Sequence, residues 1–238
     1  MSKEFEMSDL GLLTYYLGIE VKQGPNGITI HQEAYARRVL EETNMDGCNL
    51  THIPMEFGLQ MSKAMDEAEI DATQYRRRIG CLRYLMHTRP DMAFSVGILS
   101  RYMYSPRESH GKALKQVLRY LKGTLSYGLE YKQEKMQKLI GYSDSSHNTD
   151  PDDGKSTTGY IFCVGETPIS WSSQKQDVVA LSSCEAEYMA ATEATKQAIW
   201  LQELMSEITG SKEEKTLIRV DNKSAIALAK KPGLSPKK

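Results

Sequence analysis

Residues 138–175, KLIGYSDSSHNTDPDDGKSTTGYIFCVGETPISWSSQK, decide the fold of this chain. They contain three short β-type segments, KLIGYSDS, STTGYIFCVG and PISWSSQK, which are separated by residues that form turns. A long helical pattern follows from about 182 to 208, then a strand that ends at Asp221 and a helix from about 222 to 230. This order predicts an α/β fold, more closely an α+β mixed sheet that is flanked by helices.

The part of the chain before this stretch has a different pattern. Residues 12–32 predict two strands around Asn26-Gly27, because Asn-Gly supplies the positive φ of a tight hairpin turn. Apolar residues at helical spacing then predict helices at about 31–43, 73–87, 90–104 and 107–122. A strand hairpin followed by helices therefore precedes the predicted mixed sheet.

The composition of the 238 residues, with 40% hydrophobic and 26% charged residues, excludes an intrinsically disordered protein. The cysteines are widely spaced and form no Cys-x-x-Cys pair, so neither a zinc ribbon nor a redox dithiol is indicated. No apolar run approaches the roughly 20 residues of a membrane span, and the N-terminal residues lack the apolar core of a signal peptide. We expect a soluble, intracellular protein without a membrane partner, in either the cytoplasm or the nucleus.

Charge is unevenly distributed, although the formal net charge is only −1. Between Arg76 and Lys122, lysine and arginine far outnumber the acids, which are Asp91 and Glu108. In the helix expected at 107–122, apolar residues form a buried stripe and cations form a separate row. Such a row is ordinarily a solvated surface, but the excess of one charge and the nearby tyrosines favour a groove for nucleic-acid phosphates. The predicted nucleic-acid-binding residues are Lys112, Lys115 and Arg119.

Three carboxylates stand where α/β folds gather their chemistry. Asp144 and Asp221 each close a strand-like run, and Glu187 opens the long helical pattern. Acids from such positions can converge on Mg²⁺, which prefers carboxylate oxygens, water and phosphate. Two such ions can activate a water and stabilise the leaving oxygen of a phosphodiester. Spacing alone would match many sets of three acids, so it only makes Asp144, Glu187 and Asp221 candidate catalytic residues and ligands for Mg²⁺, with Mn²⁺ as an alternative.

The long helical pattern distinguishes Glu187 from Glu185. Steps of three and four from Glu185 reach polar residues, so this side chain is expected to face solvent or to cap the helix start, where a negative charge suits the helix dipole. The same steps from Glu187 follow a small and apolar lane that should face the sheet, which consists of Ala190, Ala191, Ala194, Ala198, Leu201, Leu204 and Met205. Glu187 is therefore predicted to point inward.

Long stretches of the chain also resemble a known family, in unbroken order and over nearly the whole length. They are YLGIEV, YRRRIGCLRYLMHTRPDMAFSVGILSRYM, ALKQVLRYLKGTLSYGLEY, GYSDSSHNTDPDDGKSTTGYIF, ISWSSQKQDVVALSSCEAEYMAATEATKQAIWLQEL and VDNKSAIALAKKP. These stretches resemble the reverse transcriptase and ribonuclease H portion of copia-type LTR retrotransposon Pol polyproteins. The resemblance implies a remnant reverse transcriptase palm hairpin and helical thumb or connection region at 1–124, followed by a C-terminally truncated ribonuclease H-like domain at 125–238.

The resemblance also implies an activity, the hydrolysis of the RNA strand of RNA–DNA hybrids with two Mg²⁺ ions. The acids of the family's first strand, helix and next strand end fall on Asp144, Glu187 and Asp221. In the family, a Tyr-Val-Asp-Asp polymerase motif lies upstream of the sequence Phe-Glu-Met-Ser-Asp-Leu-Gly, which begins here at Phe5. The chain is therefore not expected to be a polymerase on its own. A fourth acid follows a Thr-Lys-His-Ile run in the family, and the sequence stops before that run, so weak activity is expected.

These observations leave competing hypotheses. The leading one is a retrotransposon-derived ribonuclease H that binds RNA–DNA hybrids or other nucleic acid, and for which a longer Pol polyprotein could be a partner. The alternatives are a non-catalytic nucleic-acid-binding remnant and a fragment that forms no stable protein. His147-Asn148-Thr149 stands where the family has Trp-Ala-Gly, and His147 is a weak candidate for a metal ligand because a histidine in a polar loop is usually solvated.

Overall fold

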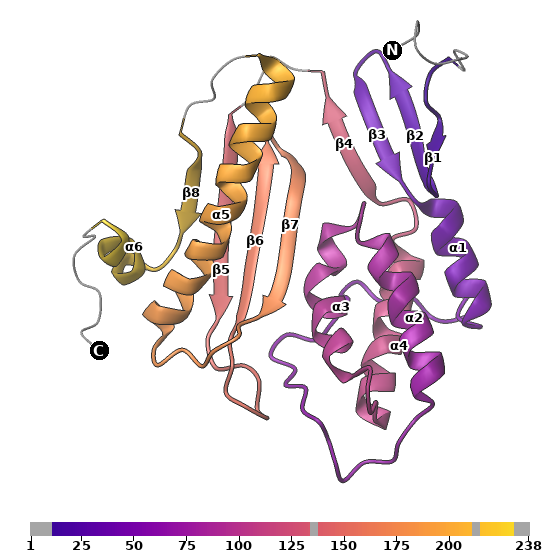
Figure 1. Ribbon diagram of the computed structural model, residues 1–238. Helices are drawn as coiled ribbons and strands as arrows, with labels where there is room; N and C mark the ends of the chain where they lie inside the picture. The colour runs from indigo at the N-terminus through magenta and orange to yellow at the C-terminus, as the bar shows by residue number, and fades with distance from the viewer. Residues whose placement is uncertain (1–10, 134–137, 211–214, 231–238) are drawn as a thin grey trace, which may run out of the picture.

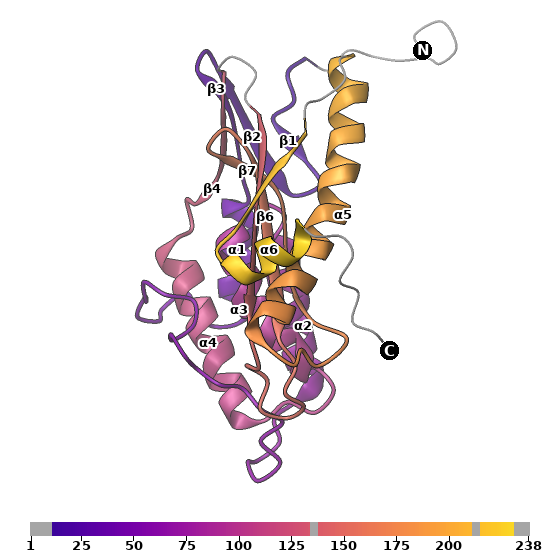
Figure 2. The ribbon, with the colours of Figure 1, turned by 90° about the vertical axis from the view of Figure 1, so that its left-hand side faces the viewer.

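The computed structural model describes residues 11–133, 138–210 and 215–230. The strands form two four-stranded sheets, one antiparallel and one mixed, and the helices pack beside them (Figures 1 and 2). The predicted mixed α/β class is therefore confirmed.

The first sheet joins the N-terminal hairpin to a strand from the middle of the chain. Its order is β1 (Tyr15–Tyr16), β2 (Ile19–Gly24), β3 (Gly27–His31) and β4 (Gly128–Lys132), and all its pairs are antiparallel. Glycine permits the close approach of β3 and β4, because a Cβ on Gly128 would lie 2.2 Å from the carbonyl oxygen of Ile30. This pairing brings residues from both sides of the predicted boundary at 124/125 into one sheet.

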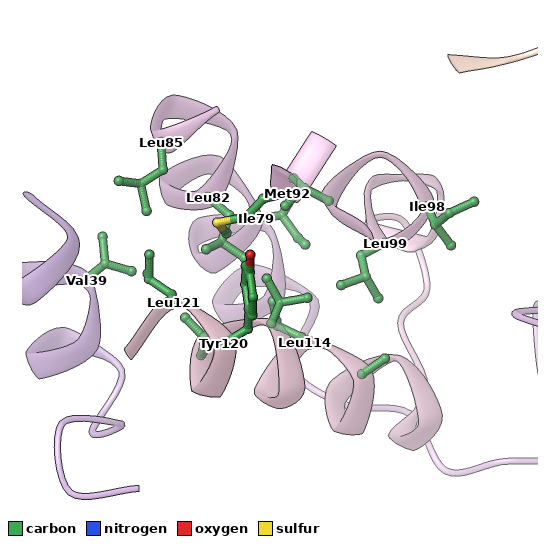
Figure 3. Packing of buried hydrophobic residues seen from close by; sticks show 14 of the residues in the cluster. Val39, Ile79, Leu82, Leu85, Met92, Ile98, Leu99, Leu114, Tyr120 and Leu121 are labelled. Atoms are coloured by element: carbon green, nitrogen blue, oxygen red, sulfur yellow. The ribbon is translucent and has the colours of Figure 1, made fainter. Parts of the chain in front are cut away.

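Helices between β3 and β4 share a core of their own (Figure 3). Their bounds are α1 (Glu33–Glu42), α2 (Ala72–Leu85), α3 (Ala93–Leu99) and α4 (Glu108–Gly123), with 3-10 turns at Pro90–Met92 and Ser100–Tyr102. The prediction of one continuous helix over 90–104 is wrong at both ends. Serine hydroxyls compete there for the helix backbone: Ser95 Oγ donates to the carbonyl of Met92, and Ser100 Oγ donates to that of Val96.

The second sheet has the order β7-β6-β5-β8, with β5 and β8 parallel and the other pairs antiparallel. Its elements are β5 (Leu139–Ser146), β6 (Thr157–Val164), β7 (Thr167–Lys175), α5 (Ser183–Thr209), β8 (Leu217–Val220) and α6 (Lys223–Ala229). The predicted order of three strands, a long helix, a strand and a short helix is confirmed.

The two faces of the second sheet meet different helices. On one face, Phe162 of β6 packs against Ala194, Ala198 and Leu201 of α5. The other face is covered at β7 by α3, where Gly97 lies so close that a Cβ on it would be 3.1 Å from the carbonyl oxygen of Ser173. The sheet is thus covered by α3 at β7 on this second face, whereas Tyr142 and Asp144 of β5 are exposed.

Candidate metal centre

The three predicted acids meet at one end of the second sheet. Asp144 lies near the carboxyl end of β5, and Asp221 directly follows β8. Since these parallel strands pair Ser143 with Val220, the two aspartates that follow these residues lie next to each other at this end of the sheet. Glu187 joins them from α5, and one carboxylate oxygen from each of the three residues lies within 4.8 Å of the others.

The start of α5 determines which glutamate reaches the centre. Ser182 Oγ accepts a hydrogen bond from the Glu185 backbone N–H at 3.2 Å, and Glu185 Oε2 accepts one from the Leu181 N–H at 2.7 Å. Glu185 therefore caps the helix, which is a role that its sequence position allowed. Glu187 is only 6% exposed and its Oε1 accepts from the Ser145 N–H at 3.1 Å, so its predicted inward direction is confirmed.

The electrostatics of this cluster favour a bound cation. Burial raises the pKa of Glu187 above its ordinary value of 4.5, and repulsion by Asp144 and Asp221 raises it further, while the Ser145 N–H acts in the opposite direction. Glu187 Oε2 is buried and accepts no hydrogen bond from any described residue. Within the described parts of the chain, no lysine, arginine or histidine forms an ion pair with these acids. Hard carboxylate oxygens that lack a counter-charge suit Mg²⁺ or Mn²⁺.

His147 is not a member of this cluster. Its Nε2 lies 3.3 Å from the carbonyl oxygen of Ala180, so the ring contacts the backbone of the loop that precedes α5. The interpretation of His147 as an ordinary loop histidine fits this contact better than ligation does.

A second group of acids, which the sequence analysis did not single out, lies in the loop between β5 and β6. Asp150 is buried, and its Oδ2 lies 2.5 Å from Lys175 Nζ and 3.5 Å from Arg101 Nη1. Asp153 Oδ2 lies 2.9 Å from the same Lys175 Nζ. In the sequence, TDPDDGK is typical of a turn, and nothing in it indicates a buried acid whose partners come from η2 (Ser100–Tyr102) and β7.

The predicted cationic row on α4 does not meet the metal centre. Lys112 and Lys115 are exposed, Lys112 Nζ lies 3.9 Å from Glu108, and Arg119 Nε donates to the Asn49 carbonyl at 2.7 Å. The helix packs against α1 and α3, and both ribbon views place it apart from α5 and β8 (Figures 1 and 2).

Several other cations of the basic middle segment have structural partners. Arg89 is buried, pairs with Asp91 at 2.7 Å and donates to the Thr124 carbonyl at 2.9 Å. Arg107 pairs with Glu69 at 3.0 Å. Much of the positive charge counted in the sequence is therefore used in internal ion pairs and is not available to a ligand.

A search of the described helices for a membrane-spanning segment finds none with the required length and hydrophobicity.

Comparison with known proteins agrees with the resemblance of the long sequence stretches. A family model described as reverse transcriptase (RNA-dependent DNA polymerase) matches residues 1–57. The retrovirus-related Pol polyprotein from transposon RE1 of Arabidopsis thaliana is 38% identical over 232 residues, which are 98% of this chain and 16% of that polyprotein. The corresponding polyprotein from transposon TNT 1-94 of Nicotiana tabacum is 37% identical over 239 residues, 97% of this chain and 18% of the relative.

A shorter relative matches across most of both chains. The uncharacterized mitochondrial protein AtMg00810 of Arabidopsis thaliana is 34% identical over 200 residues, which cover 84% of this chain and 83% of that protein. Of the two Pol polyproteins, by contrast, the chain spans less than a fifth. With the reverse transcriptase match at its N-terminal end, the chain belongs to the family of copia-type retrotransposon Pol polyproteins.

Proposed function

We propose that this chain is a ribonuclease H that hydrolyses the RNA strand of RNA–DNA hybrids at Asp144, Glu187 and Asp221. The observation that carries the proposal is the convergence of three carboxylates, with oxygens within 4.8 Å of one another, around a buried Glu187 Oε2 that has no partner among the described residues. Divalent ions held by these oxygens would supply an activated water and stabilise the leaving oxygen of the phosphodiester.

The three side chains have different tasks in this proposal. Asp144 and Asp221 are exposed, so their carboxylates can meet both a cation and a substrate that arrives from solvent. Glu187 is buried and oriented by the Ser145 N–H, which leaves its Oε2 free for a cation. Because the positions of the acids are set by two strands and a helix, little reorganisation is needed when a substrate binds.

The proposed domain organisation follows from the same features. A ribonuclease H-like domain would consist of the second sheet with α5 and α6, and the reverse transcriptase match at 1–57 supports a palm remnant in the first sheet. Since β4 pairs with β3, we place the division after Lys132 rather than after Thr124. The helices α1 to α4 would form the thumb or connection region, with Lys112, Lys115 and Arg119 as a candidate contact for nucleic acid.

Cleavage of a hybrid that carries a labelled RNA strand tests the proposal. With Mg²⁺, we expect Asp144→Asn to reduce the cleavage rate by about 100-fold, since electrostatic stabilisation of the transition state commonly contributes that much. Glu185→Gln is the matched control, because Glu185 caps the same helix without reaching the cluster, and it should retain nearly full activity. Equal cleavage by the wild type and Asp144→Asn would exclude this site. Binding of the hybrid without any cleavage would favour the non-catalytic alternative.

A further inference from the structure

A large cavity lies between α2, α3 and β7, on the face of the second sheet that is opposite α5. Its volume is about 950 Å³, and the residues that line it include Arg83, His87, Arg101 and Lys175, with Tyr84 and Trp171. None of its described lining residues is an aspartate or a glutamate. Cations and aromatic rings without acids are the combination that binds the phosphates and bases of a nucleic-acid strand.

Arg83 supplies the charge that is available to a ligand. Arg101 and Lys175 are neutralised by Asp150 and Asp153. Arg83 is exposed and forms neither an ion pair nor a hydrogen bond with any residue that the structure describes. A phosphate would therefore gain an unpaired guanidinium at Arg83 without breaking an existing ion pair.

The aromatic rings beside Arg83 are held in place. Trp171 Nε1 donates to the Met86 carbonyl at 3.1 Å, which fixes the indole of β7 to the end of α2. Tyr84 lies edge-on to His87, with ring centroids 5.2 Å apart. Pre-positioned rings lose little conformational entropy when the sugar–phosphate backbone of a strand packs against them.

The cavity opens onto the same sheet face as Asp144. The antiparallel register aligns Asp144 of β5 with Gly159 of β6, and Gly159 with Ser173 of β7. Residues that are directly opposite in a sheet share one face, so this row runs from the cavity wall to the metal centre across two strand spacings, about 10 Å. A Cβ on Gly159 would meet no heavy atom nearer than 3.9 Å, so the middle of the row is an open floor of backbone.

We infer that one strand of a nucleic-acid duplex lies in this cavity and passes over Gly159 toward Asp144. The inference deepens the proposed function, on which its choice of ligand rests. Arg83 contacts a backbone phosphate, and Trp171 packs against a sugar of the same strand. The contact surface in this inference is the wall formed by α2, α3 and β7.

Fluorescence anisotropy with a labelled RNA–DNA hybrid in EDTA, over a series of salt concentrations, tests this inference without requiring catalysis. Arg83→Gln should weaken binding by about 3- to 10-fold and reduce the slope of log K against log salt by about 1, because one phosphate contact is lost. Arg83→Lys should restore the slope, since the charge is retained. Arg38→Gln is the matched control, because Arg38 is also an exposed arginine but lies on α1, outside the cavity lining, and it should change neither quantity.

A second variant tests the path without altering charge. Gly159→Val should weaken binding and leave the salt slope unchanged, because the side chain covers the open floor; Gly159→Ala, with the smaller obstruction, should have a smaller effect. Wild-type binding by Arg83→Gln, a loss with Arg38→Gln alone, or no binding by the wild type would overturn the inference. A hybrid that binds through Arg83 but is never cleaved would contradict only the proposed function, and cleavage with no dependence on Arg83 would contradict only the cavity.

Discussion

One group of acids lies at the metal centre of the second sheet and another in the loop between β5 and β6, and their electrostatic environments are opposite. Around Asp150 and Asp153, Lys175 and Arg101 balance the negative charge. Hydrogen bonding from Lys175 lowers the pKa of Asp153, and burial acts in the opposite direction. In the cluster of Asp144, Glu187 and Asp221, no cation of the described residues forms an ion pair with the carboxylates. Burial and the repulsion between the acids raise the pKa of Glu187.

The difference teaches how to separate structural from functional acids. Arg101 belongs to the helical part of the chain, and it pairs with Asp150 and donates to Thr157 Oγ1 of β6 at 2.9 Å. The paired group thus fastens the helices to the second sheet. The unpaired group raises the free energy of the folded state, and a bound divalent cation would relieve that cost.

The paired group gives the largest expected effect on stability. Asp150→Asn should lower the free energy of unfolding by about 3 kcal/mol, because Arg101, whose side chain is 15% exposed, loses its charge partner. Urea denaturation followed by circular dichroism measures this change. The control is Asp153→Asn, whose side chain is 39% exposed and which should lose at most about 1 kcal/mol. Equal small losses in both variants would show that burial does not distinguish the two acids.

The position of the metal-centre acids could be predicted from the sequence, but the pairing of Asp150 and Asp153 could not. Asp144, Glu187 and Asp221 close or open regular elements, and strand ends and a helix lane are visible in local periodicity. The row of small and apolar residues at steps of three and four from Glu187 even predicted that Glu187, and not Glu185, points inward. The pairing of Asp150 could not be predicted, because Asp150 stands in a turn-like loop and its partner Arg101 belongs to a distant element that only the tertiary fold brings to it.

The first sheet and the cations show the same limit. Local periodicity does not identify the neighbour of a strand, and β4 pairs with β3, which lies about 100 residues earlier in the chain. Counting lysine and arginine indicated a basic ridge on α4. The number of cations could not show that Arg89 and Arg107 form internal ion pairs, or that Arg83 lines a cavity. These features depend on tertiary contacts.

The unpaired group should respond to metal. At a free Mg²⁺ concentration of about 100 times Kd, binding adds about 2.7 kcal/mol to the stability of the folded state, which corresponds to a rise in Tm of about 5–10 °C for a chain of this size. Differential scanning calorimetry in Mg²⁺ and in EDTA measures the rise. Asp144→Asn should remove most of it, and NaCl of matched ionic strength controls for screening. An equal rise in Asp144→Asn would assign the binding to other residues.

Removal of one charge from the unpaired group should stabilise the metal-free protein. The pKa of Glu187 is higher in the folded state than its ordinary value of 4.5, so ionised Glu187 destabilises the fold. This cost is complete above the folded-state pKa and disappears as pH falls below about 4.5. In EDTA at pH 8, Glu187→Gln should therefore gain about 1 kcal/mol, or about 2–4 °C in Tm, and the gain should shrink as pH is lowered. Glu185→Gln, which weakens a helix cap, should gain nothing at either pH. If Glu187→Gln were instead less stable than the wild type at pH 8, the buried carboxylate would be serving the fold, and the contrast between the two groups of acids would not hold.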